Sequence, residues 1–180
     1  MRARGQGHRP SAIALTLAAG LLTLAPASAS GGVKVSAGGV HTCAVKTSGR
    51  IACWGSDVYG QASPPGGEFR SVSAGFYHTC GVKMSGKLAC WGYDNYGQAS
   101  PPGGEFRSVS GGDFHTCGVK TSGRIACWGS DDYGQASPPG GEFRSVSAGY
   151  LHTCGVKTSG KIACWGSDGD GQTDVPPSLG

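Results

Sequence analysis

Short runs of apolar and small residues recur along the chain from residue 33 onward. In the second copy of this pattern the runs cover residues 69–73, 78–83 and 87–91, and Gly and Ser lie between them. Runs of this length that are bounded by turn-forming residues are typical of β-strands. No segment between them has the spacing of an amphipathic helix. The pattern predicts an all-β protein made of short antiparallel strands.

The three-strand pattern occurs four times with a period of 37 residues. Aligned on Val35, Val72, Val109 and Val146, the repeats fill the region 33–180. Their spans are about 35–71, 72–108, 109–145 and 146–180. A unit this short cannot bury its own faces, so neighbouring copies must stack on one another.

Each copy contains two cysteines, which the expected hairpin places opposite each other. Residues 47–49 fit a three-residue hairpin loop closed by a glycine in the left-handed conformation. If Lys46 faces Arg50 across this loop, Cys43 faces Cys53, at a Cα separation of about 4.5 Å that a disulfide tolerates. The predicted disulfides are Cys43 with Cys53, Cys80 with Cys90, Cys117 with Cys127, and Cys154 with Cys164.

The same register makes both faces of the hairpin apolar. Cys43 and Val45 lie on one face, and Ala44 and Trp54 lie on the other. A sheet of this kind must be covered on both sides, as a blade is in a ring or an arc of blades.

Other recurring residues have both a structural and a chemical interpretation. The histidines at 41, 78, 115 and 152 are expected to hydrogen-bond backbone groups between blades, rather than to act as bases. The tryptophans at 54, 91, 128 and 165, and the tyrosines at 59, 96 and 133, are expected in the core between blades.

A metal site of His41, Cys43 and Cys53 has too few ligands, and residues 168–170 are expected to form a variant turn rather than a calcium loop. We expect no metal and no cofactor.

The N-terminal segment has the features of a secretory signal peptide. Arg2, Arg4 and Arg9 precede an apolar stretch at residues 12–24, and Ala-Ser-Ala follows at residues 27–29. This order predicts a signal peptide over residues 1–29, with a retained signal anchor as the alternative. We therefore expect a secreted, extracellular protein with no membrane span.

Charge argues against a nucleic-acid partner. The chain carries 15 Lys and Arg against 11 Asp and Glu, and the loss of three arginines with the signal peptide leaves 12 against 11. A nucleic-acid binder needs a clustered basic surface, for which this nearly neutral mature chain gives no electrostatic case.

The motif H-T-C-x-V-K-x-S-G-x-x-x-C-W-G-x-D-x-Y-G-Q resembles the repeat of the regulator of chromosome condensation family. The resemblance covers residues from about 33 to 172 and implies a β-propeller. The signal peptide and the paired cysteines resemble the secreted bacterial branch of the family. Family propellers usually close with seven blades, so four units imply an open arc, a tight ring, half of a homo-dimeric ring, or a fragment of a longer propeller.

The copies differ non-conservatively in two short windows, one between the first and second strands and one after Trp-Gly. Antiparallel pairing places both windows at one end of every blade, and the constant Lys and Arg of the hairpin tips at the other. Loops on a rigid scaffold usually carry binding, although neutral drift is the alternative. The predicted binding residues are Val40, Val58, Phe76, Tyr77, Tyr93, Asn95, Asp113, Phe114, Asp132, Tyr150 and Leu151.

These features favour a non-enzymatic recognition module that binds a protein or a surface glycan. Nearly every His, Glu and Lys occupies a position shared by the copies, which leaves no separate catalytic set. The family resemblance implies two further functions. One is inhibition of a secreted enzyme such as a β-lactamase, and the other is guanine-nucleotide exchange, which export argues against.

Overall fold

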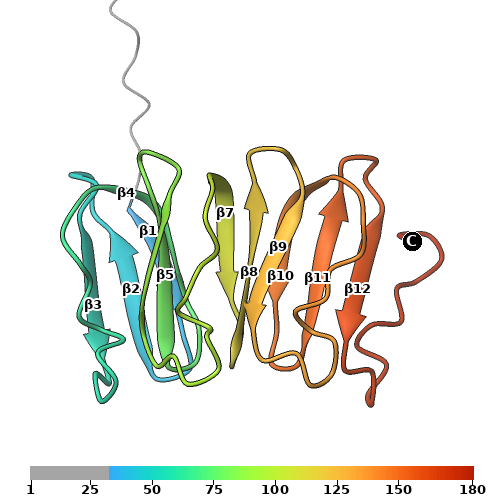
Figure 1. The fold of residues 1–180 in the computed structure, drawn as a ribbon, viewed down its shortest axis with the longest axis horizontal. Helices are drawn as coiled ribbons and strands as arrows, with labels where there is room; N and C mark the ends of the chain where they lie inside the picture. The colour runs from blue at the N-terminus through green and yellow to red at the C-terminus, as the bar shows by residue number, and fades with distance from the viewer. Residues whose placement is uncertain (1–32) are drawn as a thin grey trace, which may run out of the picture.

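Three antiparallel strands form each of four blades in the computed structural model, which describes residues 33–180 (Figure 1). The signal peptide predicted for residues 1–29 lies outside the described residues. The strands are β1 (Lys34–Ala37), β2 (His41–Val45), β3 (Ile51–Gly55), β4 (Phe69–Ala74), β5 (His78–Lys83), β6 (Leu88–Gly92), β7 (Phe106–Gly111), β8 (His115–Lys120), β9 (Ile125–Gly129), β10 (Phe143–Ala148), β11 (His152–Lys157) and β12 (Ile162–Gly166).

This architecture confirms the all-β prediction, with strand ends that differ by one residue. The third strand of the second blade begins at Leu88 rather than Lys87, because the carbonyl of Lys87 closes the hairpin turn by accepting from the N–H of Lys83 at 2.9 Å. The described part of the chain contains no helix long and apolar enough to cross a membrane.

The hairpin register is the one expected from the three-residue loop. Gly49 closes that loop with a φ of 78°, a left-handed conformation that glycine adopts without strain. Cys43 then lies directly opposite Cys53, and the same pairing occurs in every blade. All four predicted disulfides are formed, and the described residues contain no free cysteine.

The blades stack in chain order, and blade 1 and blade 4 lie at opposite ends of the stack (Figure 1). The first strands of successive blades contact one another, and the middle strand of each blade contacts the first strand of the next. Across the described residues the stack is an open arc, because the outer faces of blades 1 and 4 do not meet.

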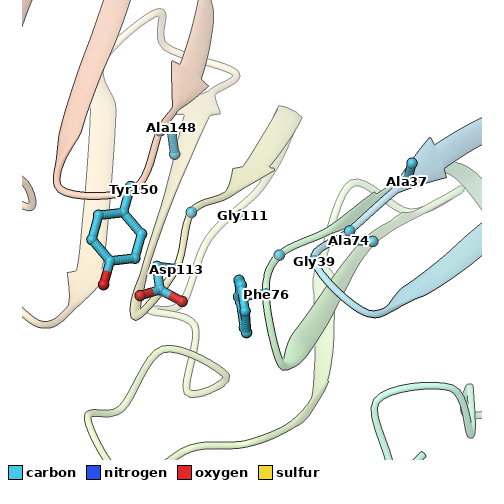
Figure 2. A pocket seen from close by; sticks show the side chains of 12 residues that line it. Ala37, Gly39, Ala74, Phe76, Gly111, Asp113, Ala148 and Tyr150 are labelled. Atoms are coloured by element: carbon cyan, nitrogen blue, oxygen red, sulfur yellow. The ribbon is translucent and has the colours of Figure 1, made fainter. Parts of the chain in front are cut away.

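Glycines allow the blades to approach closely at the ends of the first strands. A Cβ on Gly38 would lie 2.3 Å from the carbonyl oxygen of Gly75, and one on Gly75 would lie 2.6 Å from that of Gly112. Neither contact leaves room for a side chain, since backbone cannot move aside. The segments that follow these glycines border a hollow that opens to the surface (Figure 2).

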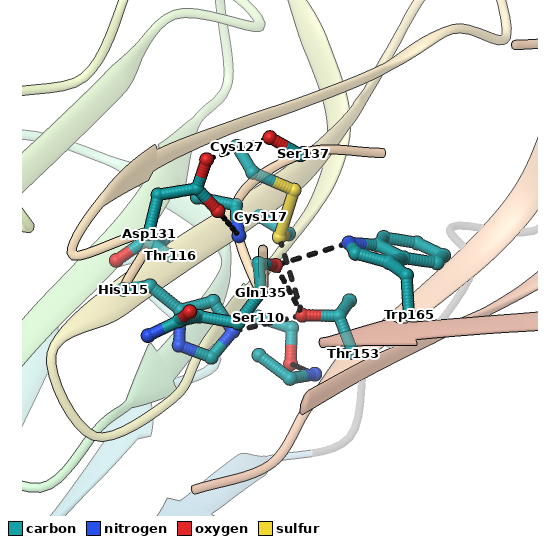
Figure 3. The surroundings of a disulfide bond; sticks show 12 residues. Ser110, His115, Thr116, Cys117, Cys127, Asp131, Gln135, Ser137, Thr153 and Trp165 are labelled. Atoms are coloured by element: carbon teal, nitrogen blue, oxygen red, sulfur yellow. Dashed lines mark hydrogen bonds between the residues drawn. A yellow bond between two sulfur atoms is a disulfide. The ribbon is translucent and has the colours of Figure 1, made fainter. Parts of the chain in front are cut away.

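A chain of buried hydrogen bonds joins each blade to the next, and we call it the interblade latch. At the interface of blades 3 and 4, His115 Nε2 lies 2.8 Å from Thr153 Oγ1 (Figure 3). The Thr153 hydroxyl donates to the main-chain carbonyl of Gln135 at 3.0 Å. Trp165 Nε1 donates to the same carbonyl at 3.0 Å. The same bonds occur at the two other interfaces. Between blades 1 and 2 they join His41, Thr79, Gln61 and Trp91. Between blades 2 and 3 they join His78, Thr116, Gln98 and Trp128.

The latch fixes the tautomer of its histidines. Each threonine hydroxyl gives its one proton to a glutamine carbonyl, so it accepts from the Nε2–H of the histidine. The Nδ1 atoms of His41, His78 and His115 are buried without a partner among the described residues. Burial, reinforced by neighbouring histidines, lowers the pKa of His78 and of His115 to about 4, because a charged ring would lose its hydration.

Two expectations about the repeated residues need correction. The histidines do lie between blades, but their partner is a threonine hydroxyl and not a backbone group, because the threonine reaches across from the next blade. Trp91, Trp128 and Trp165 lie between blades as expected. Trp54 does not, and its side chain is 55% exposed because no described blade precedes blade 1.

The latch predicts that Thr116→Val lowers the free energy of unfolding by about 1–3 kcal/mol, since the Nε2–H of buried His78 loses its acceptor. Thr42→Val is the matched control. It occupies the same position on the outer face of blade 1, where its hydroxyl has no hydrogen-bond partner among the described residues, and in dilute solution the substitution should cost less than about 0.5 kcal/mol. Equal losses in urea unfolding of the two variants would contradict the role of the latch.

Candidate recognition surface

Backbone hydrogen bonds join the two variable windows within each blade. Tyr93 N donates to the carbonyl of Tyr77 at 2.9 Å, and Ser130 N donates to that of Phe114 at 2.8 Å. Blade 1 has the matching bond from Ser56 N to Val40, and blade 4 has the one from Ser167 N to Leu151. Both windows therefore share one end of each blade, and together they form a single candidate surface.

Constant residues hold the second window in one conformation. The Asp94 carboxylate accepts from Ala99 N at 2.7 Å and from the Ser100 hydroxyl at 2.6 Å, and Gln98 Oε1 accepts from Tyr96 N at 3.0 Å. The equivalent bonds lower the pKa of Asp57, mainly through the Ser63 hydroxyl. The side chains of these constant residues are used in hydrogen bonds that hold the turn. The residue types at the neighbouring variable positions can therefore differ between blades without changing the conformation of the turn.

Blade 4 keeps the same turn despite its altered sequence. Asp168 Oδ1 accepts from Thr173 N at 2.8 Å, and Gln172 Oε1 accepts from Asp170 N at 2.8 Å. Residues 168–170 are thus a variant of the repeated turn. Within residues 33–180, no three His, Cys, Asp or Glu side chains are grouped to hold a metal ion.

Six aromatic rings from blades 1 to 3 make a continuous series of contacts, which we call the aromatic surface. Tyr59 packs on Tyr77 with centroids 5.3 Å apart, and on Tyr93 at 4.9 Å. Tyr96 packs on Phe114 at 5.0 Å. The members are Tyr59, Phe76, Tyr77, Tyr93, Tyr96 and Phe114. Rings from separate repeats thus support one another across two blade boundaries, edge to face between blades 1 and 2 and in a tilted arrangement between blades 2 and 3.

The aromatic surface is accessible to a partner. Tyr59 is 47% exposed and Tyr96 is 51% exposed, whereas Phe76, Tyr77, Tyr93 and Phe114 are half-buried. Tyr133, at the same turn position in blade 3, is also exposed. The expectation that Tyr59, Tyr96 and Tyr133 lie in the core between blades is therefore wrong. Their turns project the rings outward, and the interblade space is taken by the latch instead.

The remaining predicted binding residues surround these rings or lie apart from them. Asn95 Nδ2 donates to the Tyr93 hydroxyl at 3.1 Å and so belongs to the edge of the aromatic surface. Asp132 is exposed and accepts from Ser130 Oγ at 3.1 Å. The other members outside the ring contacts are Val40 and Val58, both exposed, Tyr150, exposed, and Leu151, half-buried.

Asp113 lines the hollow at the ends of the first strands. This hollow has a volume of about 240 Å³ and is bordered by backbone and alanines, with Phe76, Asp113 and Tyr150 as its larger side chains (Figure 2). Asp113 is only 5% exposed, and burial raises the pKa of its carboxyl group. Phe76 belongs to both features, so the hollow adjoins the aromatic surface.

Four three-stranded blades stacked in an open arc define part of a β-propeller. The Regulator of chromosome condensation (RCC1) repeat matches residues 33–61, 69–98, 106–135 and 143–172. The chain therefore belongs to the RCC1 repeat family. A comparison with curated protein sequences gives no match.

Solved structures support the same assignment. The CRINKLY WD40 ectodomain of the Arabidopsis thaliana receptor kinase ACR4 is 33% identical, with a TM-score of 0.63 over 74% of this chain and 49% of its own. The ectodomain of the Physcomitrella patens receptor kinase CR4 is 32% identical, with a TM-score of 0.65 over 74% and 38%. Yeast RCC1 (Prp20), in a structure with Kap60, shares the fold at 17% identity, with a TM-score of 0.70 over 81% and 46%. This chain spans half or less of the length of these structures.

The burial of Asp113 predicts a pH-dependent effect of Asp113→Asn. A raised pKa in the fold means that the native state holds the proton more tightly than the unfolded chain does. The resulting stabilisation is present below the ordinary value of 3.8 and is lost as the pH rises through the pKa of the folded state. The variant should therefore be more stable than the parent at pH 7, and this gain should disappear toward pH 3.

Thermal unfolding across this pH range measures the difference. Asp132→Asn serves as the control, because it removes a carboxyl group that is exposed in the same blade. A gain for Asp113→Asn that is the same at pH 3 and pH 7 would contradict the assignment.

Proposed function

We propose that this chain is a secreted, non-enzymatic recognition module that binds a protein partner through the aromatic surface. The observation that carries the proposal is the contact of six rings across three blades. Tyr and Phe bury a large area at little entropic cost, and they are enriched at interface centres. The mutual packing holds these rings in place before a partner arrives, which reduces the ordering cost of binding.

The relatives favour a protein as the partner. The yeast RCC1 structure includes Kap60, and another structure of the same protein describes its binding properties toward Gsp1p and histones. A surface glycan is the alternative ligand, because sugar rings also pack on aromatic faces. Inhibition of a secreted enzyme such as a β-lactamase would be one form of protein binding.

Secretion is supported by three independent features. Four disulfides cross-link the blades internally, which is typical of oxidising compartments. Two of the similar structures are receptor ectodomains. The N-terminal sequence has the order of a signal peptide. Together they weigh against guanine-nucleotide exchange on an intracellular GTPase, the other function that the family resemblance implies.

The absence of catalytic activity is supported by where the polar side chains are used. The histidines of blades 1 to 3 are buried in the latch, and the aspartates of the repeated turns accept backbone and hydroxyl hydrogen bonds. Asp113 is the exception. Its buried carboxylate between Phe76 and Tyr150 suits a Lys or Arg side chain that projects from the partner, since a cation would offset the desolvated charge.

The experiment is capture of partners from the native extracellular medium, followed by affinity measurement with the captured species. Replacing Tyr59 and Tyr96 together with Ala should weaken binding at least about 30-fold, the effect of losing interface hot spots. Tyr133→Ala is the matched control. It occupies the same turn position and is 57% exposed, but its ring lies outside the contacts of the aromatic surface.

Loss of capture after protease treatment of the medium identifies a protein, and loss after glycosidase treatment identifies a glycan instead. Equal binding by the double variant and the parent would overturn the proposal for the aromatic surface.

A further inference from the structure

The two end blades present opposite halves of the interface that the chain builds three times internally. We call the outer side of blade 1, with Thr42, Ala44, Ala52 and Trp54, the leading face. The outer side of blade 4, with His152, Cys154, Val156 and Ile162, is the trailing face. At each internal boundary the trailing side of one blade covers the leading side of the next. We infer that the trailing face of one copy of this chain docks on the leading face of a second copy.

The leading face exposes what its internal counterparts bury. Trp54 is 55% exposed, whereas Trp91 and Trp128 are half-buried and Trp165 is 9% exposed. Thr42 is half-buried, but the threonines at its position in the other blades are completely buried. Trp54 Nε1 has no acceptor within the described residues, where each later tryptophan donates to a glutamine carbonyl of the preceding blade.

The trailing face is open in the complementary way. His152 and Val156 are half-buried, although His115 and Val119 at the same positions are fully buried. Gln172 is half-buried, whereas Gln61 and Gln98 are fully buried. The C-terminal segment hydrogen-bonds along the edge of β12, from Ile162 N to the Leu179 carbonyl at 2.7 Å, and leaves these side chains accessible.

Docking would therefore complete a fourth latch between copies. His152 Nε2–H would donate to the Thr42 hydroxyl of the second copy, and that hydroxyl would donate to the Gln172 carbonyl. Trp54 Nε1 of the second copy would donate to the same carbonyl. Each donor and acceptor of this fourth latch would then have the same kind of partner as its counterparts at the three internal boundaries.

Two substitutions make this contact weaker than the internal ones. Position 44 is Ala where Gly81, Gly118 and Gly155 stand in the other blades, and position 32 is Gly where the others have Phe. A Cβ on Gly155 would lie 3.1 Å from Ile125 Cδ1, so Ala44 requires a small shift of the facing Ile162 side chain. The missing Phe removes the ring that packs on the tryptophan of each later blade. We therefore expect reversible association.

The contact joins two different faces, so each copy keeps one free face after the first docking event. Two copies that join through both pairs of faces form a closed ring of eight blades. This number lies at the upper end of the usual range of about four to eight blades in closed propellers. Copies that do not close in this way continue to add head to tail.

Sedimentation equilibrium of the oxidised chain over a range of concentrations tests the inference. The parent should reach at least twice the mass of one chain. Trp54→Lys on the leading face, or Val156→Lys on the trailing face, should weaken association at least about tenfold. Both side chains are already partly exposed, so each variant should keep the circular dichroism spectrum of the parent. Met84→Lys is the control, since Met84 is 62% exposed in the hairpin loop between β5 and β6 and lies on neither face.

Mixing the two variants discriminates between geometries. Trp54→Lys keeps an intact trailing face and Val156→Lys keeps an intact leading face, so an equimolar mixture should form pairs of one copy each and no larger species. A parent chain that stays monomeric at every concentration would overturn the inference. The inference would also be overturned if the equimolar mixture associated no more strongly than either variant alone, because that result would indicate a symmetric contact.

Discussion

The structure depends on the interblade latch, in which a histidine, a threonine and the main-chain carbonyl of a glutamine join two strands and a turn from two neighbouring blades. A blade of three short strands has two apolar faces and cannot stand alone, so the stability of the chain lies in the contacts between copies. Apolar packing alone would allow blades to slide over one another. A buried hydroxyl that must satisfy one donor and one acceptor permits a single register, because any shift leaves polar groups unpaired in the interior.

The same requirement explains which residues stay constant. Histidine and threonine build the latch through their side chains, and glycine permits the close approach of the first strands. Aspartate and the glutamine side chain hold the second variable window in its turn. Because these constant residues hold the fold, the conformation of the blades does not depend on the residue types at the variable positions of that end. Tyr77, Tyr93 and Phe114 can therefore form a surface whose composition changes from blade to blade while the framework stays fixed.

Much of the fold could be predicted because one short loop determined it. The glycine at position 49 set the hairpin register, and the register set the cysteine pairs. The partners of the histidines could not be predicted, because Thr79 lies 38 residues from His41 and its position depends on how blades stack. The exposure of Tyr59 and Tyr96 was missed for the same reason. A recurring aromatic residue is equally consistent with core and surface until the latch is known to fill the interblade space. Asp113 was found because it departs from its copies, but its hollow is formed by four chain segments that only the fold brings together.

The most direct test of this account is the protonation state of His78 and His115, measured by the ¹⁵N chemical shifts of their rings during a pH titration. The latch predicts a neutral ring with its proton on Nε2, which stays uncharged until the pH approaches 4. As these rings become charged at lower pH, the blades should come apart. Rings that titrate near the ordinary value of 6.5, or that carry the proton on Nδ1, would contradict the latch as the interaction that orders the blades.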